Sequence, residues 1–352
     1  MKKTRTWIAG LSVAVVLAGI AHAQGQEQDW GPFAGPWKGY DKNPVITLEG
    51  RETYSIQNGP QTVIAWKGRW VMFLQTSQPM VTKLAVSEDG LTWKRPHHDY
   101  LLKPEMPWEG SYNLAKAAVV RGDEVWLYYF GKKGGRESIG LARSGDLVNW
   151  QKEPQSIFTS DDSRIEGTTR AFPDCVIREG DTWYMYHDVG VDYGHPNYPN
   201  YAIGVATSKD GVTWTDSTKS PVLSPAANDS DEWDRASTSH ASVHRIGDWF
   251  YMLYSGAIGK KEKGQAFGLA RARHPEGPWE KYPRNPVFKP TGDEADFDGV
   301  FLQHPCPVKV DGQWRLYYNG WTRTPKAKNS IGAVYAIGIA FVPAGGKARK
   351  AK

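Results

Sequence analysis

The chain has 352 residues, enough for one large domain or two ordinary ones. Aromatic residues make up 12% of it, Gly and Pro are plentiful, and Ala/Leu-rich helical stretches are missing, so the composition predicts a turn-rich, all-β protein. The net charge of +5 is modest and lies partly at the two ends of the chain, so we do not expect a nucleic-acid partner.

The N-terminus has the layout of a secretory signal peptide. A basic start at residues 1–5 precedes an apolar run at residues 7–20 and then Ala21, His22 and Ala23. The alternative is a membrane anchor, but the run is shorter than the roughly 20 residues that span a bilayer. We expect cleavage after Ala23 and a secreted or periplasmic bacterial protein. No later stretch is apolar enough for a membrane span.

Five copies of one pattern follow along the chain. In each, an apolar pair leads through a polar turn to an aromatic strand, which predicts a β-hairpin. A third strand comes next, then in four copies a turn closed by Trp, and then a short fourth strand. The copies begin at Val63, Val119, Val176, Val243 and Val308. A four-stranded unit that recurs every 55 to 70 residues or so is typical of a propeller blade.

The two ends of the repeat predict how the ring closes. The fifth copy stops after its third strand, while residues 43–46 (Asn-Pro-Val-Ile) match the fourth strand at residues 285–288 but have no blade before them. We therefore predict a five-bladed β-propeller of four-stranded antiparallel blades, with an N-terminal strand completing the last blade. Residues 24–343 would form this single domain, and residues 344–352 a basic, solvated tail.

Cys175 and Cys306 precede the inner strands of the third and fifth blades, with the fourth blade between them. A disulfide needs Cα atoms within about 7 Å. We therefore expect two free, buried thiols, and the spacing of the two residues matches no metal motif.

The functional face of a propeller is expected at the mouth of the axis, where the inner strands begin. Asp174 is the one acid in the segments just before these strands, and a buried carboxylate there is either paired or functional. The alternatives are a catalytic or substrate-binding role and an ion pair with Arg170 or Lys116. His240 and His304 occupy equivalent places and could act as general acid, sugar hydrogen-bond donor or metal ligand.

Acids also recur farther upstream of the inner strands, and recurrence indicates a structural role for most of them. These acids are Glu109, Glu166, Asp234 and Asp298. Glu166 is a catalytic candidate because it shares a blade with Asp174 and Arg170.

The remaining candidates are binding residues. After the third hairpin, His187, Asp188, Asp192 and His195 could bind a metal or substrate, although we expect a solvated loop there. The predicted substrate-binding residues are Asn58, Lys116, Arg170, Gln303 and Asp188, and a structural Ca²⁺ could occupy the axis.

The blade repeat, with Gly-Asp-x-Trp-Tyr-Met-Tyr at residues 180–186 and Ala-Thr-Ser-x-Asp-Gly-x-x-Trp at residues 206–214, resembles the five-bladed propeller glycosidases. That group includes glycoside hydrolase families 43 and 117, the invertase-like enzymes and the family 130 phosphorylases. The resemblance implies axial acid/base residues and covers nearly the whole mature chain. The chain departs from family 43 at Asn58-Gly59-Pro60, where an acid is expected, and at Lys116, which replaces an Asp. Family 117 uses a histidine as acid, which implies His240 or His304 in that role with Asp174 as base.

The sequence therefore allows three functions. The leading one is hydrolysis of a plant or algal oligosaccharide or polysaccharide at the axial mouth, with Asp174 or Glu166 activating water. Arg170 and Lys116 would suit an anionic sugar. The alternatives are a lyase that acts on a uronate-containing glycan and a carbohydrate-binding propeller without turnover.

Overall fold

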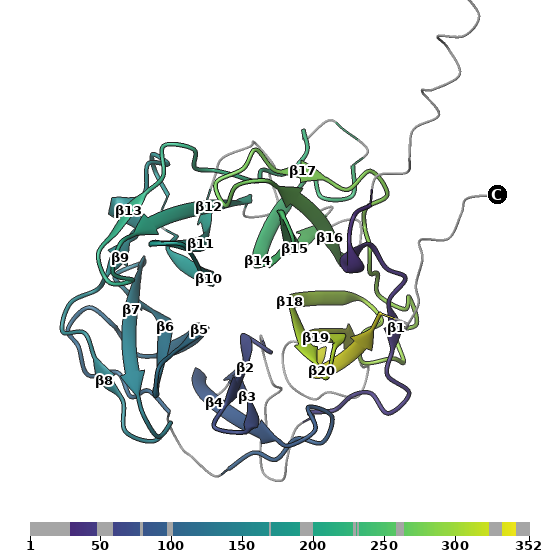
Figure 1. The fold of residues 1–352 in the computed structure, drawn as a ribbon, viewed down its shortest axis with the longest axis horizontal. Coiled ribbons are helices and arrows are strands. Elements are labelled where there is room, and N and C mark those ends of the chain that lie inside the picture. The colour runs from purple at the N-terminus through teal and green to yellow at the C-terminus, as the bar shows by residue number, and fades with distance from the viewer. Residues whose placement is uncertain are drawn as a thin grey trace, which may run out of the picture.

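The computed structural model describes residues 29–47, 59–77, 80–96, 101–168, 170–190, 200–227, 230, 232–257, 264–323 and 333–342. Within these ranges the secondary structure is twenty strands and two short 3-10 helices, η1 (Pro32–Ala34) and η2 (Ser160–Asp162). No helix in the described ranges is both long and apolar enough to span a bilayer. The strands form antiparallel blades around a common axis (Figure 1), which confirms the predicted five-bladed β-propeller.

Each blade begins with an inner strand beside the axis and continues outward through its second and third strands (Figure 1). In chain order the blades are, over the described residues, blade I with β2 (Thr62–Trp66), β3 (Arg69–Ser77) and β4 (Met80–Ser87); blade II with β5 (Asn113–Arg121), β6 (Glu124–Lys133) and β7 (Arg136–Ser144); blade III with β10 (Phe172–Glu179), β11 (Thr182–Gly190) and β12 (Tyr201–Ser208); blade IV with β14 (Ser237–Ile246), β15 (Trp249–Ala257) and β16 (Gln265–Ala272); and blade V with β18 (Phe301–Val310), β19 (Gln313–Arg323) and β20 (Ala333–Phe341).

The fourth, outer strand is split into two short pieces. In blades II to V the pieces pair with the third strand as follows: β8 (Gln151–Lys152) and β9 (Phe158–Thr159) with β7, β13 (Trp214–Asp216) and Leu223 with β12, β17 (Glu280–Lys281) and Phe288 with β16, and β1 (Lys38–Gly39) and Ile46 with β20. In the described residues of blade I, Lys94 forms a single bridge to Val86 of β4. The predicted fourth strands are therefore correct in place but shorter than a full strand.

The N-terminal segment closes the ring as predicted. The side chain of Asn43 accepts a hydrogen bond from the Ile339 amide at 2.9 Å and donates one to the Ile339 carbonyl at 2.9 Å. Asn285 makes the same pair of bonds to Leu269 in blade IV. The N-terminal segment thus substitutes for an outer strand that the fifth repeat lacks.

Tyrosines of the second strands tie three of the five blades to the next one. The Tyr128 hydroxyl donates to the Gly211 carbonyl of blade III, and the Tyr186 hydroxyl donates to the Pro275 carbonyl of blade IV. The Tyr317 hydroxyl donates to the Gly90 carbonyl at 2.7 Å, which joins the last blade to the first. These fully buried rings also fill the apolar core between the sheets.

Candidate active site at the mouth of the axis

The inner strands of blades II to V each contain a β-bulge at the same level of the axis. The regular pairing is interrupted at Lys116 in β5, at Asp174 in β10, at His240 in β14 and at His304 in β18. His240 and His304 both adopt a left-handed φ of 55°, a conformation that is costly for a non-glycine residue. Bulges re-aim side chains, and these four bring the predicted polar residues together at one level.

Asp174 and Asp188 form a hydrogen-bonded carboxyl pair. Burial and the negative charge of Asp188 raise the pKa of Asp174 well above its usual value. Burial also opposes ionisation of Asp188, but His240, Arg170 and the hydrogen bond from Asp174 together lower its pKa. Asp174 therefore keeps its proton to higher pH than Asp188 does.

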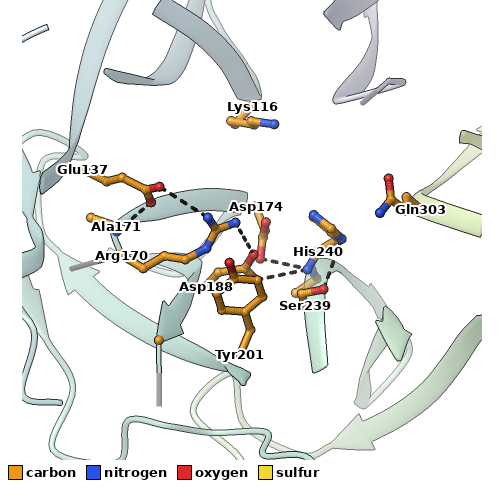
Figure 2. Close-up of polar contacts among 12 residues, drawn as sticks. Lys116, Glu137, Arg170, Ala171, Asp174, Asp188, Tyr201, Ser239, His240 and Gln303 are labelled. Carbon is orange, nitrogen blue, oxygen red and sulfur yellow. Dashed lines mark hydrogen bonds and ion pairs between the residues drawn. The ribbon is translucent and has the colours of Figure 1, made fainter. Parts of the chain in front are cut away.

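Backbone and side-chain donors fix this pair in place (Figure 2). The Ala241 amide donates to Asp174 Oδ2 at 3.2 Å, and the His240 amide donates to Asp188 Oδ1 at 3.1 Å. Arg170 Nη2 donates to Asp188 Oδ2 at 3.1 Å. Asp188 is completely buried, whereas Asp174 keeps some accessible surface because it lines the axial cavity.

Arg170 connects blade III to blade II. Its Nη1 lies 3.3 Å from Glu137 Oε1 in β7, and the second oxygen of Glu137 accepts from the Ala171 amide. Burial disfavours the charged guanidinium, but Asp188 and Glu137 raise its pKa overall, so Arg170 stays charged. The expected ion pair of Arg170 is formed with Asp188 and Glu137 rather than with Asp174.

The two axial histidines are neutral at pH 7. Their ring centroids lie 3.9 Å apart. Burial, with Lys116 and Arg170 nearby, lowers the pKa of His240 to about 4 although Asp188 opposes this, and burial with the same neighbours lowers the pKa of His304 well below its usual value. Buried Nε2 of His304 has no hydrogen-bond partner among the residues that the structure describes.

Lys116 is a buried amine between two aromatic rings. Its Nζ donates to Gln61 Oε1 at 2.7 Å and lies 3.9 Å from the centroid of the Phe172 ring and 5.6 Å from that of Phe130. Burial lowers the Lys116 pKa well below its usual value, against the opposing effect of Asp174.

Two cavities meet at this level. A mouth pocket of about 290 Å³ is lined by amides, aromatic rings and the guanidinium, among them Gln75, Gln303, Tyr112, Tyr201 and Arg170. An axial cavity of about 380 Å³ continues down the axis past Asp174, Cys175, His304 and Cys306. Lys116 and His240 line both cavities, so these two residues lie at the junction between them. The two cysteines are free thiols there.

Three of the recurring upstream acids have a structural partner. Glu109, Asp234 and Asp298 accept hydrogen bonds from the hydroxyls of Tyr129, Tyr254 and Tyr318, which occupy equivalent places in the second strands. Glu166 is exposed in the loop before β10 and lines neither the mouth pocket nor the axial cavity. The structure therefore does not bring Glu166 to either of these cavities.

The expectation of a solvated loop after the third hairpin is wrong for its first two residues. His187 and Asp188 continue β11 and are completely buried, because β11 extends to Gly190 to pair with β12. His187 Nε2 lies 3.4 Å from Asp216 Oδ1. In the second strand His187 occupies the position that Tyr129 and Tyr254 occupy in their blades. Asp192, His195 and Asn58 lie outside the described residues.

The predicted calcium ion finds few oxygen ligands at the axis. Asp188 is already held by Arg170 and the His240 amide, and the neighbouring His240 and His304 offer nitrogen, whereas Ca²⁺ takes oxygen. In the described ranges no group of three or more His, Cys, Asp or Glu residues is placed to hold a metal. These residues do not fit calcium.

Sequence reasoning missed Glu137, Tyr201 and Gln265. Each stands three residues before the glycine of a third strand, namely Gly140, Gly204 and Gly268, and each faces Arg170 or lines the mouth pocket. The repeat itself could have found them, since the same position differs from blade to blade like the inner-strand residues.

The fold has close structural neighbours. A glycoside hydrolase gives a TM-score of 0.67 at 16% identity over 87% of this chain and 92% of that one. A thermostable family-43 glycoside hydrolase gives a TM-score of 0.63 at 18% identity, over 85% of this chain and 91% of that one. An N-acetylgalactosamine deacetylase from F. plautii, in complex with blood group B trisaccharide, gives a TM-score of 0.61 at 15% sequence identity. This match covers 86% of this chain and 94% of that one. No protein-family model and no curated protein matches the sequence.

The fold and the mouth site together define a five-bladed β-propeller with the architecture of glycoside hydrolases, in agreement with the resemblance seen in the sequence. At these identities the likeness concerns the fold, which hosts more than one chemistry. The activity depends on the residues of the site.

Proposed function

We propose that the protein hydrolyses a glycosidic bond at the mouth of the propeller, with Asp174 as the proton donor. The observation that carries the proposal is a carboxyl group that lines the axial cavity next to a completely buried carboxylate, which together with burial raises the pKa of Asp174. Cleavage of a glycosidic bond requires a general acid that is still protonated near neutral pH. The rings and amides of the mouth pocket suit the apolar faces and hydroxyls of a sugar.

Asp174 and Asp188 act as one unit rather than as separate acid and base. Catalytic carboxyl pairs of glycosidases flank the scissile bond at about 5–5.5 Å or about 6.5–9.5 Å. Two carboxyls in direct hydrogen-bond contact leave no room for that bond. Asp188 therefore sets the proton affinity of Asp174, and the second catalytic group comes from elsewhere.

His240 is the base in this proposal. It is neutral, it reaches both cavities, and it lies beside the carboxyl pair (Figure 2). His240 takes a proton from water as the water attacks the anomeric carbon, and Asp174 gives its proton to the departing oxygen. This reverses the assignment of a histidine acid and an aspartate base that the family 117 resemblance implies.

The substrate in this proposal is a neutral plant or algal glycan. The charge of Arg170 is matched by Glu137 and Asp188, so the guanidinium is not free to neutralise a uronate, as an anionic-sugar substrate or a lyase would need. Export after cleavage at Ala23 is part of the proposal, and N-terminal sequencing of the mature protein tests it.

The test is a screen of the mature protein on neutral oligosaccharides in H₂¹⁸O, beside Asp174→Asn. Hydrolysis places one ¹⁸O atom in each new reducing end, and the variant should lose that product. Products that absorb in the ultraviolet would indicate a lyase instead. Binding without product in either protein would indicate a carbohydrate-binding propeller.

A further inference from the structure

A second pocket opens on the same face of the propeller, between blades IV and V. Its volume is about 430 Å³, larger than that of the mouth pocket. It lies where β15 ends and β16 and β18 begin, the end of the blades that also forms the mouth. We call it the interblade pocket.

Gln265 joins the two pockets, because it lines both of them. Its Oε1 accepts a hydrogen bond at 2.7 Å from Gln303, which lines the mouth pocket from blade V. A chain of sugars could therefore pass from the mouth pocket to the interblade pocket along this amide pair.

Trp233 and two prolines give the interblade pocket apolar walls. A Cβ atom at Gly256 would lie 2.3 Å from the Trp233 ring, so this glycine lets the ring lie flat on blade IV. Trp233 is nevertheless only half-buried, and Pro286 and Pro290 line the same pocket. Aromatic and proline surfaces of this kind are suited to the apolar face of a sugar ring.

The polar groups of the interblade pocket are mixed in charge. Lys289 supplies a cation, Glu294 a carboxylate and Gln265 an amide, and both charged residues are exposed. Donors and acceptors without a dominant sign fit the hydroxyls of a neutral sugar better than a phosphate or a uronate.

We propose that the interblade pocket is a second sugar subsite, which holds a neutral residue of the glycan beyond the one in the mouth pocket. This inference rests on the proposed function and deepens it, since it makes the protein an enzyme of oligosaccharides rather than of single glycosides.

Ala266→Phe tests the subsite, with Ala266→Ser as the matched control. Ala266 lies opposite Gly256 in the β15–β16 ladder, is half-buried and lines the pocket, so a phenyl group there fills the space beside Trp233. The probes are α- and β-linked trisaccharides of arabinose, xylose, galactose and glucose, and the glycosyl fluoride of the sugar that is cleaved. The fluoride carries a one-atom leaving group and does not extend into the interblade pocket.

Ala266→Phe should lower kcat/KM for the trisaccharide by about tenfold or more and leave that for the fluoride within about twofold, while Ala266→Ser changes neither. An unchanged trisaccharide rate in a folded Ala266→Phe protein overturns the subsite but leaves the proposed function standing. Equal losses on both probes assign the effect to the mouth pocket and also overturn it. If the wild type cleaves no sugar of the panel and no fluoride, the proposed function fails and the subsite fails with it.

Discussion

Asp174 and Asp188 form a hydrogen-bonded pair, and Arg170 Nη2 donates to Asp188 Oδ2 at 3.1 Å. The two carboxyls come from neighbouring strands of one blade, and a bulge in β10 turns Asp174 toward the axis. Asp188 is completely buried, and it keeps its negative charge because Arg170 stabilises the carboxylate. Asp174 reaches the cavity and has a raised pKa, so it is the member of the pair that can give a proton to a ligand.

Asp174→Asn should lower kcat by about 10²–10⁴-fold, the usual contribution of a general acid, with KM little changed. The amide keeps the shape of the side chain and can still donate to Asp188, so the thermal midpoint should stay close to that of the wild type. Initial rates and calorimetry on the same preparations provide the check. A variant that retains more than half of the activity would exclude Asp174 as the acid.

Asp188→Asn should move the alkaline limb of the pH–rate profile to lower pH. Asp174 works only while it is protonated, so activity falls as the pH rises through its raised pKa. Removing the negative charge of Asp188 lowers that pKa. The profile of kcat/KM for both proteins measures the shift, and Asp174→Asn serves as the baseline. A limb that stays in place would mean that another group titrates there.

Arg170→Met should destabilise the fold by about 3–5 kcal/mol, because Glu137 and Asp188 would remain buried without their shared cation. Arg178→Met is the matched control, since Arg178 pairs with Asp181 at the exposed turn of the same hairpin. Arg178→Met should lower the free energy of unfolding by less than about 1 kcal/mol. Urea denaturation of the wild type and the two variants measures the free energies of unfolding. Similar decreases for both variants would show that the buried ion pairs contribute no more to stability than the exposed one.

The protein should lose stability as the pH falls from about 6.5 to about 4. Burial lowers the pKa of both His240 and His244 to about 4 in the folded protein. Between this value and their usual pKa, the unfolded chain binds more protons, so the free energy of unfolding rises with pH in that window. Each histidine contributes up to about 3 kcal/mol to this change in the free energy of unfolding. Urea titrations across this range, with His244→Gln as a comparison, should show a smaller slope for the variant; equal slopes would contradict the assignment.

Asn43→Ala and Asn285→Ala should destabilise the protein to a similar extent, about 1–3 kcal/mol each. Both side chains bond the backbone amide and carbonyl of a third strand, one at the ring closure and one inside a continuous blade. Thermal unfolding of the two variants makes the comparison. A neutral Asn43→Ala beside a costly Asn285→Ala would mean that the N-terminal segment does not close the ring in solution.

The repeat by itself determined the architecture. Period, strand pattern and turn residues recur locally in each copy, so the blades, their number and the closing role of residues 43–46 follow from the order of residues. The same pattern placed Asp174, His240 and His304 at the starts of inner strands, and a common place in the repeat becomes a common level on the axis once the ring closes.

Only the tertiary structure decided the chemistry of the site. Asp188 is 14 positions beyond Asp174 and Glu137 is in another blade, and no local pattern shows that Arg170 lies between them. Glu166 shares the blade of Asp174 but stays in solvent. Protonation states depend on burial and on charges that meet through space, so which aspartate keeps its proton could not be predicted from the residues in sequence.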